Sequence, residues 1–115
     1  MKTASLTKNI EYDQRGPTIQ VILNTNSSKE LRIAFKESQV MRRHRTPFPI
    51  VVEIFEGSID FGIDGEVLKL HRGDLLSLKG NVSHDLTAVR ESIVRLSLNK
   101  SDTVKEEEGL AKNSK

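Results

Sequence analysis

Histidine offers the most versatile chemistry in this sequence, because a neutral imidazole can bind a metal, exchange a proton or hold a polar ligand. The chain of 115 residues has three histidines and no cysteine. The lack of cysteine excludes disulfide bonds, thiolate zinc sites and a cysteine nucleophile. His71 directly precedes the turn residues Arg72 and Gly73, so we expect it to be a surface histidine. His44 and His84 remain as the candidate site residues.

Other chemistries find little support. Ser83, His84 and Asp85 are adjacent, but neighbouring residues of a strand face opposite ways and cannot form a catalytic triad. Serine-nucleophile, phosphate-loop and dinucleotide-binding motifs are absent. The 18 basic and 16 acidic residues nearly cancel, and there are only four Phe and one Tyr. The chain therefore has neither the charge nor the stacking surface that a nucleic-acid partner requires.

The elements that must position the histidines are short strands. From about residue 17 the apolar residues alternate with polar ones, the period of a β-strand. Asp64 and Gly65 form a two-residue hairpin signal, and Pro47 and Pro49 forbid a helix between them. We expect strands near residues 19–23, 31–35, 50–55, 58–63, 66–70, 75–78, 82–88 and 92–98, and an extended run that begins at Val40 and Met41 and stops near Pro47. Eight or nine strands of this length predict an all-β sandwich or barrel.

The length is that of one domain, which we place at residues 17–99. Residues 1–16 form an N-terminal segment, and the charged residues 100–115 form a tail that is either a short helix or mobile. No stretch reaches the roughly 20 apolar residues that cross a membrane, and the N-terminus lacks a signal peptide. We therefore expect a cytoplasmic protein with no membrane partner.

Two segments resemble the paired motifs of the cupin superfamily. The first motif of the family begins with a His-x-His pair and ends in a glycine, and here it runs from His44 through Pro47-Phe48 to Glu56-Gly57. The second begins with Gly-Asp and ends in a histidine, which matches Gly73-Asp74 and His84. The resemblance implies a small double-stranded β-helix, also called a jelly-roll β-barrel.

The metal ligands of the family are only half present. Metal-bearing cupins use two His and one Glu from the first motif and one His from the second, but the second His falls on Thr46 and the Glu on Ile50. Glu53 is three residues from Ile50 on a strand, so its side chain points to the opposite face. We therefore expect no cofactor. The alternative is a divalent ion of iron, nickel, manganese or zinc held by His44 and His84 with an atypical ligand set.

Without a metal, the same positions describe a ligand pocket. Strand alternation from His44 and Thr46 turns Val40 and Arg42 inward and leaves Met41 on the other face. The candidate ligand-binding residues are Arg42, His44, Thr46, Ile50, Val52, His84 and Leu86. An arginine and two histidines in an apolar pocket would suit a carboxylate or another small anion. Two simpler alternatives stay open: Arg42 lies at the rim, or the histidines are a hydrogen-bonded remnant of a metal site.

Three functions compete. The first is a small-molecule-binding protein that holds a carboxylate or a sugar and forms a homodimer through the apolar outer face around Val51 and Phe55. The second is a metal-dependent cupin enzyme, a dioxygenase or an isomerase, that uses His44 and His84. The third is a structural or partner-binding protein whose interior is filled by side chains.

Overall fold

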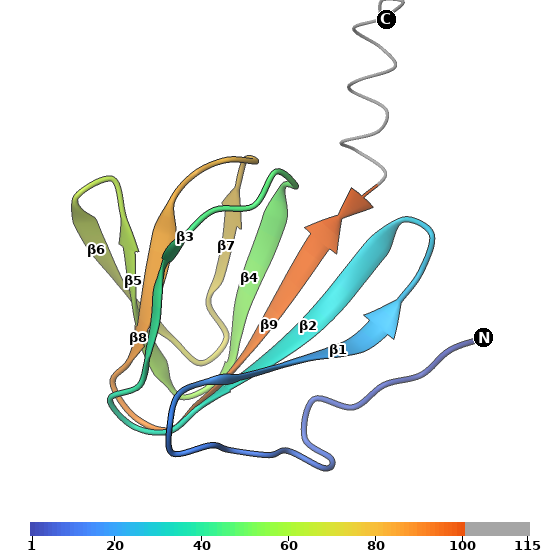
Figure 1. Cartoon of the computed structure of the whole chain (residues 1–115), viewed down its shortest axis with the longest axis horizontal. Helices are drawn as coiled ribbons and strands as arrows, with labels where there is room; N and C mark the ends of the chain where they lie inside the picture. The colour runs from blue at the N-terminus through green and yellow to red at the C-terminus, as the bar shows by residue number, and fades with distance from the viewer. Residues whose placement is uncertain (101–115) are drawn as a thin grey trace, which may run out of the picture.

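A computed structural model describes residues 1–100, and the part of the proposed tail from residue 101 to 115 lies outside them. Nine strands follow one another along the described chain (Figure 1). They are β1 (Thr18–Asn24), β2 (Ser28–Phe35), β3 (Val40–His44), β4 (Ile50–Glu56), β5 (Ser58–Ile63), β6 (Glu66–His71), β7 (Leu75–Leu78), β8 (His84–Ala88) and β9 (Ser92–Asn99). The all-β prediction and the expected strands are confirmed.

The strands form two antiparallel sheets. The large sheet has the order β1-β2-β9-β4-β7, and the small sheet has the order β3-β8-β5-β6. In Figure 1 the two sheets diverge from a shared lower edge, and β1 lies on the side of the molecule away from β6. Non-consecutive neighbours such as β2 with β9 and β3 with β8 show that pairing is mostly long-range. Each cupin-like motif contributes to both sheets: the first includes the end of β3 and all of β4, and the second includes β7 and the start of β8.

The core lies between the sheets and follows the alternation of the strands. In β4, Ile50, Val52 and Ile54 are buried, whereas Val51 is exposed on the outer face of the large sheet. The buried apolar cluster consists of Ile33, Phe35, Ile50, Val52, Ile54, Ile59, Phe61, Leu78, Leu86, Ala88, Val94 and Leu96. Full burial of such side chains stabilises a fold by roughly 1.5–3 kcal/mol each.

The hairpin between β5 and β6 has the turn that its sequence predicts. Asp64 and Gly65 both have positive φ angles, of 50° and 77°. A type I′ turn requires positive φ at both central residues, and glycine meets this requirement without steric cost. The hairpin register pairs Ile63 with Glu66 directly across the turn.

The N-terminal segment is tied to the outer face of the large sheet by Arg32 of β2. This side chain is almost fully buried, and its guanidinium donates hydrogen bonds to the carbonyl oxygens of Ser5, Lys8 and Asn9 and to Gln20 Oε1. A buried guanidinium must be hydrogen-bonded to avoid a large desolvation cost, so Arg32 fixes the path of the segment. Residues 1–100 contain no helical segment that could span a membrane.

Candidate functional site

The structure brings His44 and His84 together across two neighbouring strands. His44 ends β3, His84 begins β8, and the strand register places the two residues opposite each other. Their ring centroids lie 4.4 Å apart, with the ring planes tilted by 59°. Residues 40 positions apart in the chain thus form one imidazole pair, as the motif spacing implies.

The loops that lead into these strands are packed against each other. The Asn81 backbone N–H donates to the Thr46 carbonyl oxygen at 2.7 Å. Next to it, a Cβ atom on Gly80 would collide with the carbonyl oxygen of Pro47, so glycine is needed for the close approach. This contact between loops 45–49 and 79–83 holds the two histidines in register.

His84 is buried with one ring nitrogen satisfied and the other not. Its Nδ1 lies 2.9 Å from the Val82 carbonyl oxygen, and its ring stacks on Phe61 at 5.5 Å. A carbonyl oxygen only accepts, so Nδ1 carries the proton. Burial lowers the pKa of His84, which keeps the ring neutral. The buried Nε2 atom is therefore a lone-pair acceptor, and it has no hydrogen-bond partner among the described residues.

His44 continues the pair toward solvent. It is exposed, and its Nδ1 lies 2.8 Å from the Arg42 carbonyl oxygen. The same reasoning assigns the proton to Nδ1 and leaves Nε2 as an acceptor in the neutral ring. The two imidazoles thus link the surface to the interior. The proposal of a fully hydrogen-bonded remnant does not describe His84, because one of its nitrogens lacks a partner.

The prediction of which β3 residues face inward is wrong. Met41 packs against the core, whereas Val40 is 47% exposed and Arg42 is exposed. The reason is a register shift: Met41 pairs with Leu86 and His44 with His84, so three steps on β3 match two on β8. The extra residue is a β-bulge, so Met41 and His44 both lie beside the residues of β8 that they pair with, although His44 and Arg42 are exposed.

The remaining candidates divide between core and loop. Ile50, Val52 and Leu86 are buried, and all three belong to the apolar core cluster between the two sheets. Thr46 is half-buried beyond the end of β3, and its Oγ1 accepts a hydrogen bond from the Phe48 backbone N–H at 3.3 Å. No structural observation assigns any of these residues to a ligand, and their role stays a prediction.

The residues present do not fit the metal centre of the cupin family. Ile50 is apolar and 2% exposed at the position where that centre needs a carboxylate. Thr46 stands at the position of the second histidine, and its neutral hydroxyl is a weak metal ligand. Within residues 1–100, no group of three or more His, Cys, Asp or Glu side chains is placed to hold a metal ion. Two imidazoles alone fall short of the ligand number that a tightly bound divalent ion requires.

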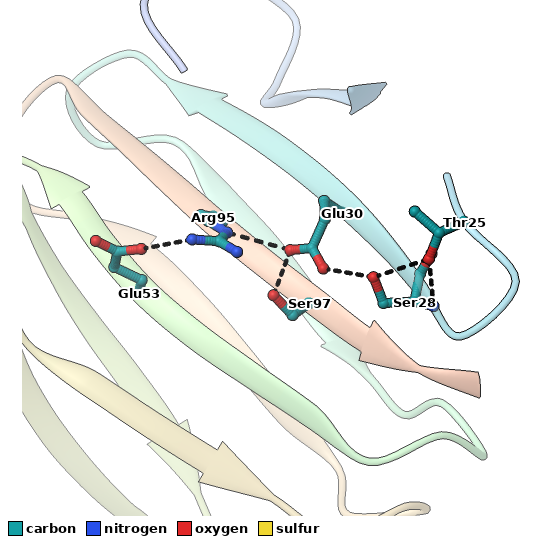
Figure 2. Close-up of polar contacts among 6 residues, drawn as sticks. All are labelled: Thr25, Ser28, Glu30, Glu53, Arg95 and Ser97. Atoms are coloured by element: carbon teal, nitrogen blue, oxygen red, sulfur yellow. Dashed lines mark hydrogen bonds and ion pairs between the residues drawn. The ribbon is translucent and has the colours of Figure 1, made fainter. Parts of the chain in front are cut away.

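A second polar cluster, which was not predicted from the sequence, lies on the outer face of the large sheet (Figure 2). Glu30 of β2 is only 7% exposed and accepts hydrogen bonds from Ser28 Oγ at 2.9 Å, from Arg95 Nε at 3.1 Å and from Ser97 Oγ. Arg95 also lies 3.5 Å from Glu53. Burial raises the pKa of Glu30, but the hydrogen bonds from Ser97, Ser28 and Arg95 outweigh it and the net pKa is lowered.

A shallow hollow adjoins this cluster. It has a volume of about 180 Å³ and is lined by Val51, Glu53, Leu75, Arg95 and Ser97. Its charged groups already contact each other, because Arg95 lies against both Glu30 and Glu53 and Ser97 donates to Glu30. Strand alternation alone places Glu30 on the outer face, but only the pairing of β2 with β9 brings Arg95 beside it.

Comparison with known proteins identifies the fold. No protein-family model and no curated protein matches the sequence. Among solved structures, an RmlC-like cupin protein from Desulfovibrio desulfuricans has a TM-score of 0.79 and 22% identity over 86% of this chain and 96% of that chain. A conserved protein with a double-stranded β-helix domain from Klebsiella pneumoniae has a TM-score of 0.80 and 18% identity, covering 90% of this chain and 93% of its own.

A third similar structure is a conserved protein of unknown function from Streptococcus pyogenes, with a TM-score of 0.72 and 21% identity over 86% of this chain and 87% of that chain. These identities are low, and the similarity concerns the whole arrangement of strands. The histidine pair and the interrupted motif lie on that arrangement. The chain is a small all-β protein with the cupin fold, a double-stranded β-helix.

Proposed function

We propose that this protein binds a small hydroxyl-bearing molecule, of which a sugar is the leading class, at the His44–His84 pair. The observation that carries the proposal is the buried Nε2 atom of His84, which lacks a hydrogen-bond partner. Most buried polar atoms in folded proteins are hydrogen-bonded, and leaving one without a partner costs about 1–3 kcal/mol. A ligand that donates a hydrogen bond would recover this cost.

The protonation of the ring selects among the ligand classes expected from the sequence. Nδ1 of His84 donates to a backbone carbonyl, so the free Nε2 can only accept. A hydroxyl group can donate a hydrogen bond to this nitrogen. An ionised carboxylate has only acceptor oxygens, so its lone pairs would repel the lone pair of Nε2. The guanidinium that would attract an anion, Arg42, is turned outward by the β3 bulge. Both points favour a neutral polyhydroxylated ligand over a carboxylate.

The alternative, a metal-dependent enzyme that uses His44 and His84, is also compatible with the orientation of the two rings. In metal sites the second ring nitrogen of each ligating histidine is bonded to a backbone carbonyl or a carboxylate, as it is here. The donor set is nevertheless too small for the metal centre of the family. Metal analysis of protein purified without chelator separates the two proposals. A stoichiometric metal would replace the ligand-binding proposal with a metal-dependent one.

The binding test compares neutral and carboxylate ligands, and it compares the wild type with a variant of His84. Neutral monosaccharides and polyols are screened by thermal shift beside their carboxylate counterparts, and hits are measured by calorimetry on the wild type and on His84→Phe. We expect a neutral compound to bind and the variant to lose at least ~10-fold in affinity, because one hydrogen bond to a buried acceptor is lost. Binding of the same compound by the variant with unchanged affinity would refute the assignment of the site.

A further inference from the structure

The end of the barrel that holds the histidine pair carries exposed positive charge. Arg42, Arg45 and Lys79 are exposed, and within residues 1–100 none of their side chains forms an ion pair or a hydrogen bond. Arg43, by contrast, lies 3.6 Å from Asp85. The three exposed side chains, here termed the rim cations, thus lack an acidic partner in the described part of the chain.

The rim cations belong to two stretches of chain that contain no acidic residue. Residues 39–52, which include Arg42 and Arg45, have no Asp or Glu, and neither do residues 75–84, which include Lys79. The two stretches pack against each other through the loop contact beside the histidines. Positive charges that are gathered on neighbouring loops attract an anionic partner and raise its local concentration.

The last described strand ends at this same end of the barrel. In Figure 1 the tip of β9 lies at the same edge as the loops that join β3 to β4 and β7 to β8. The Asn99 backbone N–H donates to the Pro49 carbonyl oxygen at 3.1 Å, so the end of β9 lies beside loop 45–49. The residues that follow Lys100 therefore start close to the rim cations.

The sequence beyond residue 100 contains charge that complements the rim. Residues 106–108 are consecutive glutamates and form the only run of three acidic residues in the chain. An extended chain spans at most about 3.6 Å per residue, so this run can lie up to roughly 20–29 Å from Lys100. On the same basis Arg45 lies at most about 14 Å from Pro49. The acidic run is thus able to reach the rim cations of its own chain.

We propose that the acidic run at residues 106–108 binds the rim cations of its own chain and thereby covers the entrance to the His44–His84 pair. Guanidinium groups bind carboxylates through two parallel hydrogen bonds, and Lys79 adds a further positive charge. Each exposed ion pair is weak, so the contact needs several pairs and weakens as salt screens them. The effect on ligand entry rests on the proposed function, whereas the contact itself does not.

Two other cations near the end of β9 compete less well for the acidic run. The ammonium group of Lys2 donates to the Asn24 carbonyl oxygen at 2.7 Å, and that of Lys100 donates to Asn24 Oδ1 at 2.9 Å. Both therefore have a partner in the described chain, unlike Lys79. They provide the competing outcomes in the experiment.

The first experiment treats the full chain with a carbodiimide, which joins a carboxylate to an amine only where the two groups are already in contact. At low salt we expect mass spectrometry to find residues 106–108 linked to Lys79, and we expect at least ~3-fold less of this product at about 0.5 M salt. A mixture of ¹⁵N-labelled and unlabelled chains shows whether the link lies within one chain. The absence of this link, links mainly to Lys2 or Lys100, or links mainly between two chains would each overturn the proposal.

The second experiment measures access to the exposed His44 ring without any ligand. Diethyl pyrocarbonate modifies accessible imidazoles, and mass spectrometry gives the rate at each histidine. A variant that combines Glu106→Gln, Glu107→Gln and Glu108→Gln should be modified at His44 at least ~3-fold faster than the wild type, because the ion pairs that hold the cover are lost. Equal rates in the two proteins would refute the cover.

Two controls separate this effect from a general change in reactivity. The combination of Lys112→Gln and Lys115→Gln changes two charges outside the acidic run and should not accelerate modification of His44. His71, which is exposed at the end of β6, should react at the same rate in all three proteins. Because no ligand takes part, failure here leaves the binding test at His84 unaffected, and failure of that test leaves the contact of the acidic run unaffected.

Discussion

The two polar clusters of this molecule are built on opposite principles. In the outer cluster, Glu30 receives three hydrogen bonds, and Arg95 is shared between Glu30 and Glu53. In the inner pair, His84 has one bonded nitrogen and one buried nitrogen without a partner. A cluster whose members satisfy one another stabilises the fold and has little left for a ligand. A buried acceptor that nothing in the described chain satisfies is the better candidate for binding.

The largest effect on stability should come from the outer cluster. Glu30→Ala leaves the Arg95 and Ser97 donors without their buried acceptor, so we expect the free energy of unfolding to fall by about 2–3 kcal/mol. Glu53→Ala removes one longer, more exposed contact and should cost under about 1 kcal/mol. Urea denaturation measures the free energy of unfolding of both variants. Equal losses for the two variants would show that the outer cluster does not depend on Glu30.

The loop contact behind the histidines should have the next largest effect. Gly80→Ala places a methyl group against the carbonyl oxygen of Pro47, so the two loops must separate, at a cost of about 1–3 kcal/mol. The control is Gly16→Ala, because a Cβ there meets no atom within 4 Å. The ring signals of His44 and His84 in NMR spectra should shift only in the first variant. Unchanged signals would mean that the loop contact does not position the pair.

Lowering the pH should reduce the stability that the ionised Glu30 carboxylate contributes to the outer cluster. The folded pKa of Glu30 lies below its ordinary value of about 4.5, so the unfolded chain takes up the proton first as the pH falls. The stability that this carboxylate contributes is complete above about pH 4.5 and is lost as the pH falls through the folded pKa. Urea denaturation between pH 6 and pH 3 should show a smaller loss for Glu30→Gln than for the wild type. Parallel curves would contradict this role.

The smallest effect on stability is expected at the inner pair. His84→Phe removes a buried nitrogen without a partner and retains a ring of similar size against Phe61, so we expect a change within about 1 kcal/mol. The same change should weaken ligand binding by at least ~10-fold, because one hydrogen bond to the ligand is lost. Thermal melting and calorimetry provide the two measurements. A loss of several kcal/mol would show that His84 is a structural residue like Glu30.

Local patterns were sufficient to predict much of the fold. The alternation of β4 identifies Ile50, Val52 and Ile54 as core, and Asp64-Gly65 identifies the β5–β6 turn. These features depend on neighbouring residues only. The extra residue in β3 and the contact of Glu30 with Arg95, 65 positions away, depend on how distant strands align. No local pattern contains that information, which is why Arg42 was predicted on the wrong face.

The candidate site shows the same division. The motif spacing predicted that His44 and His84 would meet, and the two rings lie in contact. The free nitrogen of His84 could not be predicted, because it depends on which backbone carbonyl each ring meets in three dimensions. The proposed preference for a neutral hydroxylated ligand over a carboxylate therefore depends on ring orientation more than on residue identity.

The most direct test is the NMR spectrum of protein labelled with ¹⁵N in its histidine rings, recorded at neutral pH with and without a bound sugar or polyol. We predict that His84 carries its proton on Nδ1, that its Nε2 has the chemical shift of an unprotonated ring nitrogen, and that ligand binding shifts the Nε2 signal. A proton on Nε2 in the free protein, or a bound ligand that leaves the His84 signals unchanged, would contradict it.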